Sequence, residues 1–243
     1  MTAPKHPARK VQSTFTAKIP TKCKQCHMSY FSHIKNDVNT HKKYHTNFLE
    51  GPSWLASSAC KTLKSIQLRK GRKNTSVTLI SVDKSDSNDH LKLVMKVVNN
   101  ELNAVAEFEH WKYTNTGIEG KAYLAIAARR VVGVCTIEPI VNPELQCRWM
   151  VFNTQELVPE QTNSSIKIGI SRIWVAPNWR RLGIAQTLLD AVREYTIYGV
   201  VLNKHELGFS QPSSSGGLLS KYYNGKMHKS GEFLIPVYLE LPQ

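Results

Sequence analysis

The sequence predicts a mixed α/β domain that is preceded by a small zinc-binding module and a basic N-terminal arm. Three observations support this prediction. Strand-like and helix-like apolar patterns follow one another over residues 77–243, cysteines and histidines with metal-ligand spacing lie within residues 21–47, and positive charge is concentrated before residue 74. A chain of 243 residues with 41% hydrophobic residues can bury one main core and a small accessory module.

The charge is distributed unevenly along the chain. Residues 1–73 contain 15 basic and 2 acidic residues, whereas residues 74–243 contain 17 and 16. Clustered cations indicate contact with nucleic acid or another acidic surface, and the alternative is a solvated tail. We therefore expect DNA or chromatin to bind the basic N-terminal third. Because the sequence has neither an apolar run of membrane-spanning length nor a signal peptide, we expect a soluble intracellular protein with no membrane contact.

The N-terminal region divides into three segments. Residues 1–20 lack apolar periodicity and predict a disordered basic arm. Residues 21–47 contain the pattern C-x2-C-x14-H-x3-H, formed by Cys23, Cys26, His41 and His45. Two thiolates from a tight turn and two imidazoles one helical turn apart can surround Zn²⁺ tetrahedrally, so this pattern predicts a structural zinc site. Residues 48–76 are rich in Gly, Ser, Lys and Asn and predict a basic linker.

The remaining elements follow from apolar periodicity. Residues 89–103 place an apolar stripe on one helical face, and residues 184–195 repeat this pattern. A turn at Ala128 and Arg129 separates two expected strands. The expected strands are 76–82, 121–128, 130–140, 148–152, 166–175, 205–210 and 233–241, and residues 211–217 predict a Ser/Gly-rich loop.

The junction between the strand 166–175 and the following helix contains the clearest pattern for ligand binding. The residues from Arg180 to Ala185 (RRLGIA) have small side chains at Gly183 and Ala185, which allow close approach of a ligand to consecutive backbone N–H groups. A helix N-terminus with nearby arginines binds phosphate or pyrophosphate. The junction therefore predicts a nucleotide-like cofactor.

This strand, R-x-x-G-x-A and helix arrangement is similar to the acetyl-CoA pyrophosphate loop of the GNAT acetyltransferases. Four further segments resemble the Eco1/ESCO family of cohesin acetyltransferases, namely GISRIWV, FSQPSSSGG, YNGKMHKSGEFLIPVY and a finger that ends in HKKYH. The resemblance covers residues 21–47 and 77–243. It implies a GNAT-like mixed β-sheet flanked by helices, with a small N-terminal C2H2 zinc finger.

The resemblance also implies the site residues. The pantetheine arm of acetyl-CoA would bind the strand backbone of Ile173, Trp174 and Val175. The pyrophosphate would bind the loop formed by Arg180, Arg181, Leu182, Gly183, Ile184, Ala185 and Gln186. The C-terminal loop with Ser213, Ser214 and Ser215 would close over the cofactor. Ser171 and Asp190 match family positions implicated in catalysis. Asp190 is one methylene shorter than the family's glutamate, and Gln211 replaces a carboxylate, so the identity of the general base stays open.

The function implied is transfer of acetyl from acetyl-CoA to a lysine of the cohesin SMC ATPase subunit, in the nucleus, to establish sister chromatid cohesion during DNA replication. A lysine ammonium must first lose a proton, and Asp190 could accept it or could simply be solvated on its helix. The alternative is a catalytically inactive, chromatin-binding zinc-finger protein. Gln12 and Phe15 in the arm resemble a motif for the replication sliding clamp, with a DNA-contacting arm as the competing interpretation.

Overall fold

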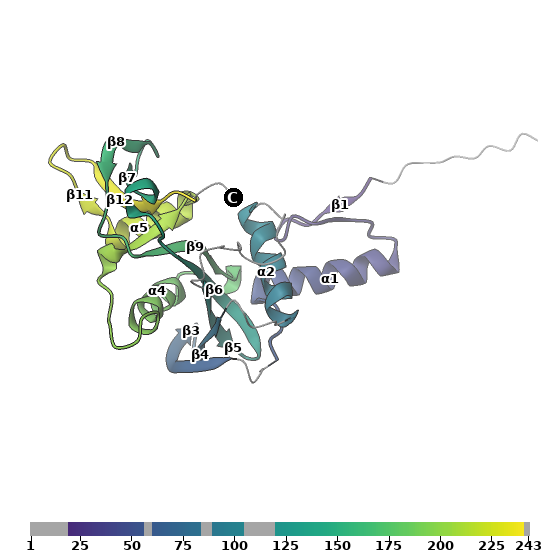
Figure 1. Cartoon of the computed structure of the whole chain (residues 1–243). Helices are drawn as coiled ribbons and strands as arrows, with labels where there is room; N and C mark the ends of the chain where they lie inside the picture. Colours follow the sequence, from purple (N-terminus) through teal and green to yellow (C-terminus); the bar gives the residue numbers. More distant parts are fainter. Residues whose placement is uncertain (1–18, 56–59, 84–88, 105–119, 241–243) are drawn as a thin grey trace, which may run out of the picture. The chain divides into compact units, whose positions relative to one another are not determined.

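The computed structural model describes residues 19–55, 60–83, 89–104 and 120–240 (Figure 1). The chain forms two compact units, residues 1–45 and 46–243, and the boundary falls within helix α1 (Lys35–Glu50). The predicted arm, with Gln12 and Phe15, lies outside the described residues except for its last two positions. Among the described helices, none has the length and apolar character that a membrane span requires.

The first unit contains the predicted finger. Strands β1 (Thr21–Lys22) and β2 (Ser29–Tyr30) pair antiparallel, and α1 follows them. The backbone N–H of Phe31 donates to the Asp37 carboxylate at 3.2 Å, which joins the chain before α1 to its first turn. The short hairpin and the helix are thus the elements that carry the four predicted metal ligands.

The second unit contains one large mixed sheet. Its strand order is β3-β4-β5-β6-β9-β10-β12-β7-β8, with β11 paired to β12. The pairs β9–β10 and β10–β12 are parallel, and the others are antiparallel. The strands are β3 (Lys61–Lys70), β4 (Lys73–Asp83), β5 (Lys121–Ala127), β6 (Arg130–Pro139), β7 (Cys147–Val151), β8 (Leu157–Thr162), β9 (Ile168–Val175), β10 (Leu207–Ser210), β11 (Lys226–Met227) and β12 (Phe233–Tyr238).

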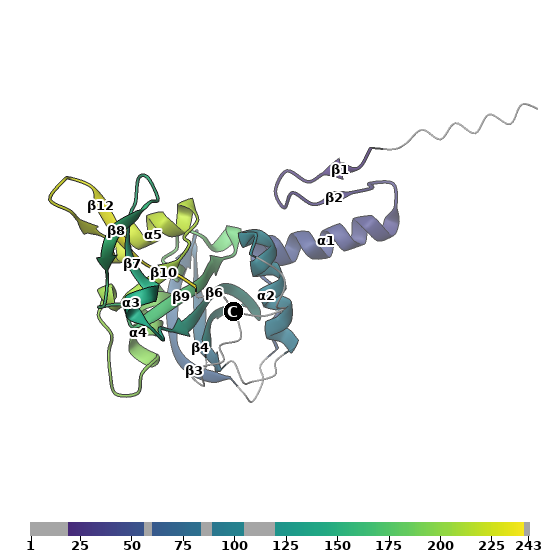
Figure 2. The same ribbon diagram turned by 45° about the horizontal axis from the view of Figure 1, so that its top comes forward.

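Helices cover both faces of this sheet. Helices α2 and α4 lie on opposite faces (Figures 1 and 2), and both present apolar stripes to one continuous core. The helices of this unit are α2 (Asp89–Leu102), α3 (Pro143–Gln146), α4 (Ile184–Tyr195) and α5 (Ser214–Asn224), with short 3-10 turns at Pro177–Trp179 and Lys204–Glu206. The structure confirms the predicted α/β class and the helix expected at 89–103. It also confirms the turn at Ala128 and Arg129, since both residues have a positive φ.

Close packing between α4 and β6 depends on one glycine. A Cβ on Gly133 would lie 2.7 Å from Cγ2 of Ile184 and 3.0 Å from Cδ1 of Leu188. The missing side chain therefore lets the first turns of α4 approach the sheet. Because α4 begins at the predicted cofactor loop, this contact helps to fix the height of that loop above the sheet.

The linker expected at residues 48–76 is wrong over much of its length. Residues 61–70 form β3, which pairs with β4 along its whole length. The partly buried side chains of Leu63, Ile66 and Leu68 pack on the core, while the intervening lysines and polar residues hide this strand pattern in the sequence.

The loop expected at residues 211–217 is also partly wrong. Helix α5 begins at Ser214, and Ser213 is its N-cap, since the Ser213 hydroxyl accepts a hydrogen bond from the backbone N–H of Gly216 at 3.3 Å. Serine is a strong N-cap residue, and here this capping property decides the local structure over the turn tendency of two glycines.

Candidate active site

The site lies where two parallel strands separate. Strand β9 pairs with β10 only through Ile168–Ile170, and the last pair joins Ile170 to Phe209. On its other side, β9 stays paired with β6 as far as Val175. In the described chain, residues 171–175 therefore have no strand partner on the β10 side. A ligand can lie there and bond to exposed strand backbone.

A cavity of about 1320 Å³ occupies this opening. It exceeds the usual range of drug-sized ligand pockets and has room for a nucleotide-sized cofactor. The structure brings most predicted site residues to its wall, namely Ser171, Ile173, Trp174, Val175, Arg180, Arg181, Gly183, Ile184, Ala185, Gln186, Ser213 and Ser215. Three predicted residues, Leu182, Ser214 and Asp190, are absent from that wall.

The predicted anion cradle has the backbone geometry it needs. Gly183 is the N-cap of α4 with φ of 82°, and Arg181 also has a positive φ of 64°. No side chain from the described residues caps this helix, and its first N–H groups lack intrahelical acceptors because the helix begins there. A Cβ on Gly183 would meet nothing within 4 Å, so the approach to these N–H groups is open. The loop can thus hold an anion such as pyrophosphate.

Arg180 is committed to the protein itself. Its guanidinium pairs with the Glu101 carboxylate, and its Nε donates to the carbonyl oxygen of Val175 at 2.9 Å. The other Glu101 oxygen accepts from the indole N–H of Trp174 at 2.5 Å. Glu101 therefore ties the end of α2 to β9 and to the cofactor loop, which leaves Arg181 as the nearby guanidinium for a ligand phosphate.

Ser171 is the unpaired residue of a β-bulge. Thr136 pairs with Arg172 and Ile137 with Ile170, so Ser171 has no opposite residue on β6. Its buried hydroxyl lies 2.8 Å from the Thr136 hydroxyl. A bulge bends a strand and redirects its side chains.

Asp190 points toward α5 instead of the cavity. Its Oδ1 accepts from the Tyr223 hydroxyl at 2.7 Å and pairs with Arg193 at 3.2 Å. The Tyr223 hydroxyl is desolvated and lies beside this carboxylate, and both effects raise the pKa of Tyr223. These two contacts hold the Asp190 carboxylate against Tyr223 and Arg193, and Asp190 is not among the residues that line the cavity. The geometry favours a structural role for Asp190.

A carboxylate that the sequence analysis missed lines the cavity. Glu240 follows β12, its Oε1 accepts from the Ser210 hydroxyl at 2.7 Å, and the Arg172 guanidinium lies 3.8 Å away. The three residues come together because β9, β10 and β12 are adjacent parallel strands that end at the same edge. No local motif marks Glu240, so only the sheet order reveals it.

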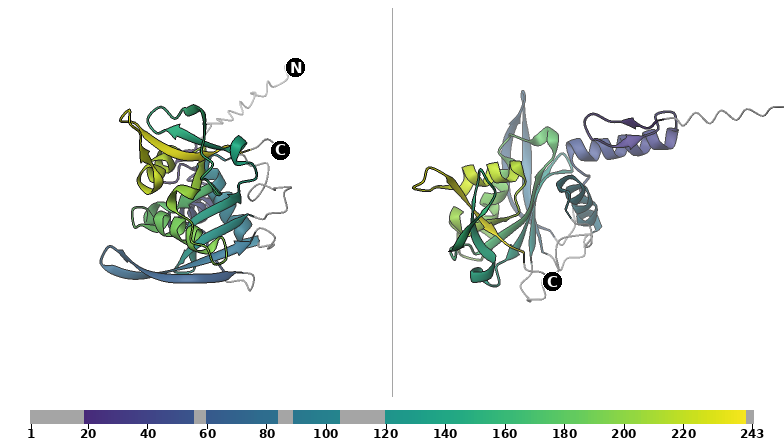
Figure 3. Two further views of the ribbon diagram at one scale, coloured as in Figure 1. Left: turned by 60° about the vertical axis from the view of Figure 1, so that its left-hand side comes forward. Right: turned by 90° about the horizontal axis from the view of Figure 1, so that it is seen from above.

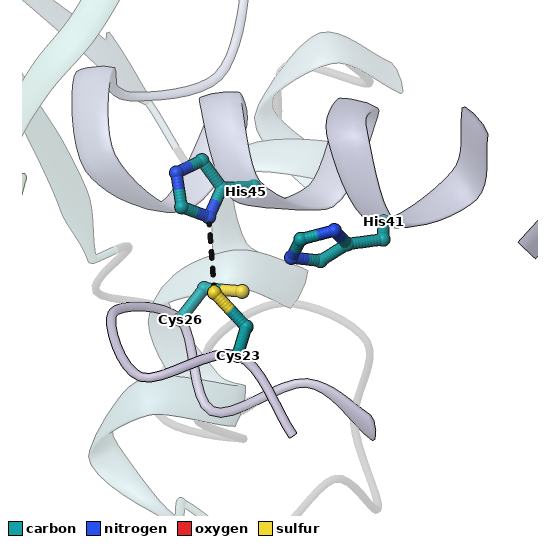
Figure 4. Close-up of side chains that lie close together, drawn as sticks. All are labelled: Cys23, Cys26, His41 and His45. Atoms are coloured by element: carbon teal, nitrogen blue, oxygen red, sulfur yellow. Dashed lines mark hydrogen bonds between the residues drawn. The ribbon is translucent and has the colours of Figure 1, made fainter. Parts of the chain in front are cut away.

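The zinc ligands of the first unit converge as predicted. The ligand atoms of Cys23, Cys26, His41 and His45 all lie within 4.8 Å of one another (Figure 4). The Cys23 sulfur is 3.5 Å from Nδ1 of His45. That matches the separation of about 3.6 Å expected between S and N ligands of tetrahedral zinc. Nε2 of His41 is buried without a hydrogen-bond partner, and backbone N–H groups of Cys26 and Gln25 lower the pKa of Cys23 to about 6. Two thiol and two imidazole ligands in this arrangement fit a zinc ion.

Family models match both units. Residues 11–47 match the zinc-finger of acetyl-transferase ESCO, residues 164–235 match the ESCO1/2 acetyl-transferase, and residues 94–197 match the Acetyltransferase (GNAT) family. N-acetyltransferase ECO1 of Debaryomyces hansenii is 45% identical over 94% of this chain and 85% of its own. The chain belongs to the ECO1/ESCO family of acetyltransferases. N-acetyltransferase ECO1 of Saccharomyces cerevisiae is 35% identical over 90% of this chain and 88% of its own.

Solved structures agree with this membership. The xEco2 acetyltransferase domain bound to K105-CoA conjugate has a TM-score of 0.55 and 25% identity, covering 75% of this chain and 99% of that chain. This ECO1/ESCO protein is therefore an acetyltransferase with a GNAT fold and an N-terminal zinc finger, and its cofactors are acetyl-CoA and zinc. The inactive alternative considered from the sequence is set aside.

Proposed function

We propose that the protein acetylates a lysine of the cohesin SMC ATPase subunit, in the nucleus, and so establishes sister chromatid cohesion during DNA replication. The observation that carries this proposal is the cavity between β9 and β10, with strand backbone on one wall and the Arg181–Gly183 cradle at one end. The solved relative bound to a K105-CoA conjugate supports a lysine as the acceptor.

Each part of the cavity has a proposed task. The N–H groups at the start of α4, with Arg181, bind the pyrophosphate, and residues 173–175 of β9 align the pantetheine arm. Bound acetyl-CoA supplies a thioester carbonyl. Ser213 and Ser215 at the start of α5 close the opposite wall. Ser171 sets the bulge in β9 and so fixes the direction of the backbone beside the acetyl group.

Glu240 is the proposed proton acceptor. A free lysine has a pKa of about 10.4, so a positioned base is needed near neutral pH. Glu240 and Glu101 are the carboxylates on the wall among the described residues. Glu101 is fixed at the cofactor loop by Arg180, whereas Glu240 lies at the end of β12, where β9 and β10 separate. Glu240 also attracts the lysine ammonium into the cavity before the proton is transferred.

Transfer of labelled acetyl groups to the SMC subunit tests whether that subunit is the substrate. The protein is incubated with labelled acetyl-CoA and the purified SMC ATPase head, and acetylated lysines are mapped by mass spectrometry. We expect label on the SMC subunit, and strongly reduced label with the Arg181→Ala variant. Autoacetylation without transfer to the SMC subunit would refute the substrate, while absence of both reactions would refute the proposed cavity chemistry.

The N-terminal third is proposed to place the enzyme on chromatin. Residues 1–73 carry a net charge of +13, and clustered cations bind DNA through counterion release. Gln12 and Phe15 are proposed to contact the replication sliding clamp. Clamp binding should be lost with Gln12→Ala plus Phe15→Ala and depend little on salt. If the arm only contacts DNA, its DNA affinity should be unaffected by this double substitution and should fall steeply as the salt concentration rises.

A further inference from the structure

A two-stranded ribbon projects from one edge of the sheet. Pairing between β4 and β5 starts at Thr78 and Ile126, but pairing between β3 and β4 continues outward to Lys70 and Lys73. Residues 66–77 thus form a two-stranded segment beyond the end of β5, which we name the β3–β4 ribbon. Figure 3 (left) shows it in blue, extending past the other strands.

The ribbon and its base carry only positive charge. Residues 61–82 contain six cations and no aspartate or glutamate, the cations being Lys61, Lys64, Arg69, Lys70, Arg72 and Lys73. Six like charges within a single hairpin repel one another in the folded state. Their arrangement on the two faces shows which of them serve the fold.

Two lysines on the inner face, Lys64 and Lys70, are neutralised within the protein. Lys64 pairs with Glu194 of α4 at 2.6 Å. Lys70 pairs with Glu50 at 3.4 Å, and its ammonium lies 3.9 Å from the centre of the Trp179 ring. The nearby carboxylates are therefore used by the inner face.

The tip has a different character. Arg69, Arg72 and Lys73 are exposed, and no ion pair to any of them is found across the part of the chain that the structure describes. Within the described ranges, the hydrogen bond found for the Arg69 guanidinium goes to the carbonyl oxygen of Gly71, at 3.3 Å. These three charges do not contribute visibly to the fold, so an external anion is the partner that they suit.

The outer face of the ribbon offers hydrogen-bonding side chains. Ser65, Gln67 and Arg69 alternate along β3 and pair across the hairpin with Thr78, Ser76 and Asn74. All six are polar, and all but the half-buried Thr78 are exposed. Hydroxyl, amide and guanidinium groups are the groups that contact DNA phosphates, and a two-stranded ribbon fits the major groove of duplex DNA.

We propose that the outer face and tip of the β3–β4 ribbon bind duplex DNA, mainly through phosphate contacts from Arg69, Arg72 and Lys73. This deepens the proposed association with DNA by assigning it to a folded surface of the acetyltransferase unit. Residues 61–82 contain no aromatic side chain on which unpaired bases could stack, and no large exposed apolar side chain that could anchor a protein partner. Duplex DNA is the polyanion that these features favour.

The test compares two triple variants of the full-length protein that have the same net charge. The first is Arg69→Gln, Arg72→Gln and Lys73→Gln. The control is Lys96→Gln, Lys226→Gln and Lys229→Gln, which changes exposed lysines on α2 and around β11. Binding of a fluorescent 20-base-pair duplex is followed by anisotropy over a range of salt concentrations, and thermal melting and acetyl-CoA titration check that both variants are folded.

We expect the ribbon variant to bind DNA at least about tenfold more weakly, and its log K against log salt slope to fall by about 2.7, which is 0.9 for each lost phosphate contact. The control should retain the wild-type slope. Equal losses in both variants, or no loss in the ribbon variant, would overturn the proposal and leave DNA binding to the N-terminal arm. Weakened binding to polyglutamate with unchanged DNA binding would overturn it in favour of an acidic protein partner.

Discussion

Arg180 and Glu101 form an ion pair between the start of the cofactor loop and the last turn of α2, although their sequence positions are 79 residues apart. The same glutamate accepts a hydrogen bond from Trp174, so one carboxylate fixes both β9 and the loop. The two consecutive arginines of the loop therefore have separate tasks. Arg180 shapes the loop, and Arg181 meets the ligand.

Substitutions of the two arginines should have different effects. Arg181→Ala should weaken acetyl-CoA binding at least about tenfold with little change in melting temperature, because a charge-assisted contact contributes about 1.5–3 kcal/mol. Arg180→Ala should lower the melting temperature, because Glu101 and the Val175 carbonyl both lose a partner. Calorimetric titration and thermal unfolding measure the two effects. Identical profiles for the two variants would contradict this division.

Glu240→Gln should lower kcat by about a hundredfold or more, the usual contribution of a positioned general base. KM for acetyl-CoA should change little, since the cradle is untouched. The conservative Glu240→Asp variant should restore part of the rate.

Asp190→Asn provides the contrast. It should lower the melting temperature by weakening the contacts with Tyr223 and Arg193, while kcat stays within about threefold of wild type. A folded Asp190→Asn protein that has lost its turnover but binds acetyl-CoA normally would show that Asp190 is catalytic and that Glu240 is not the base.

Removing the metal should affect only the finger. With chelator, or with Cys23→Ala, residues 19–45 should lose their amide protection from hydrogen exchange, because a module this small depends on metal for its folding energy. Acetyl-CoA affinity should stay the same, since the cavity wall lies entirely in the second unit. Loss of acetyl-CoA binding on chelation would contradict this separation.

Two truncated proteins test where the catalytic unit begins. A protein starting at Thr46 should fold and bind acetyl-CoA, because it contains the whole second unit. One starting at Val77 lacks β3 and leaves β4 as an exposed edge next to buried Leu79 and Val82, so it should aggregate. Size-exclusion chromatography separates these outcomes, and a monomeric, active protein from residue 77 would show that β3 is dispensable.

Gly133→Ala should weaken both the fold and the site. The added methyl group would approach Ile184 and Leu188 to within 3.0 Å or less and push the start of α4 away from β6. Overpacking of this kind costs about 1–3 kcal/mol. We expect a lower denaturation midpoint and weaker acetyl-CoA binding, whereas Gly231→Ala, in an open turn, should leave acetyl-CoA affinity unchanged.

The sequence by itself determined the features whose geometry is local. The zinc ligands are predictable because a turn and one face of a helix set the spacing of Cys23, Cys26, His41 and His45. The phosphate cradle is predictable for the same reason, since strand, turn and helix are contiguous from residue 168 to residue 195. In both cases backbone periodicity places the functional groups without help from distant residues.

Only the tertiary structure decided which distant side chains share the site. Glu240 joins Ser210 and Arg172 because three strands far apart in sequence are adjacent and parallel. Asp190 turns away because Tyr223 of α5 offers it a hydrogen bond. Residues 61–70 become a strand because β4 supplies their hydrogen bonds and the carboxylates of Glu194 and Glu50 balance two of their lysines. Strand pairing and charge pairing act between residues remote in sequence, so local periodicity carries no record of them.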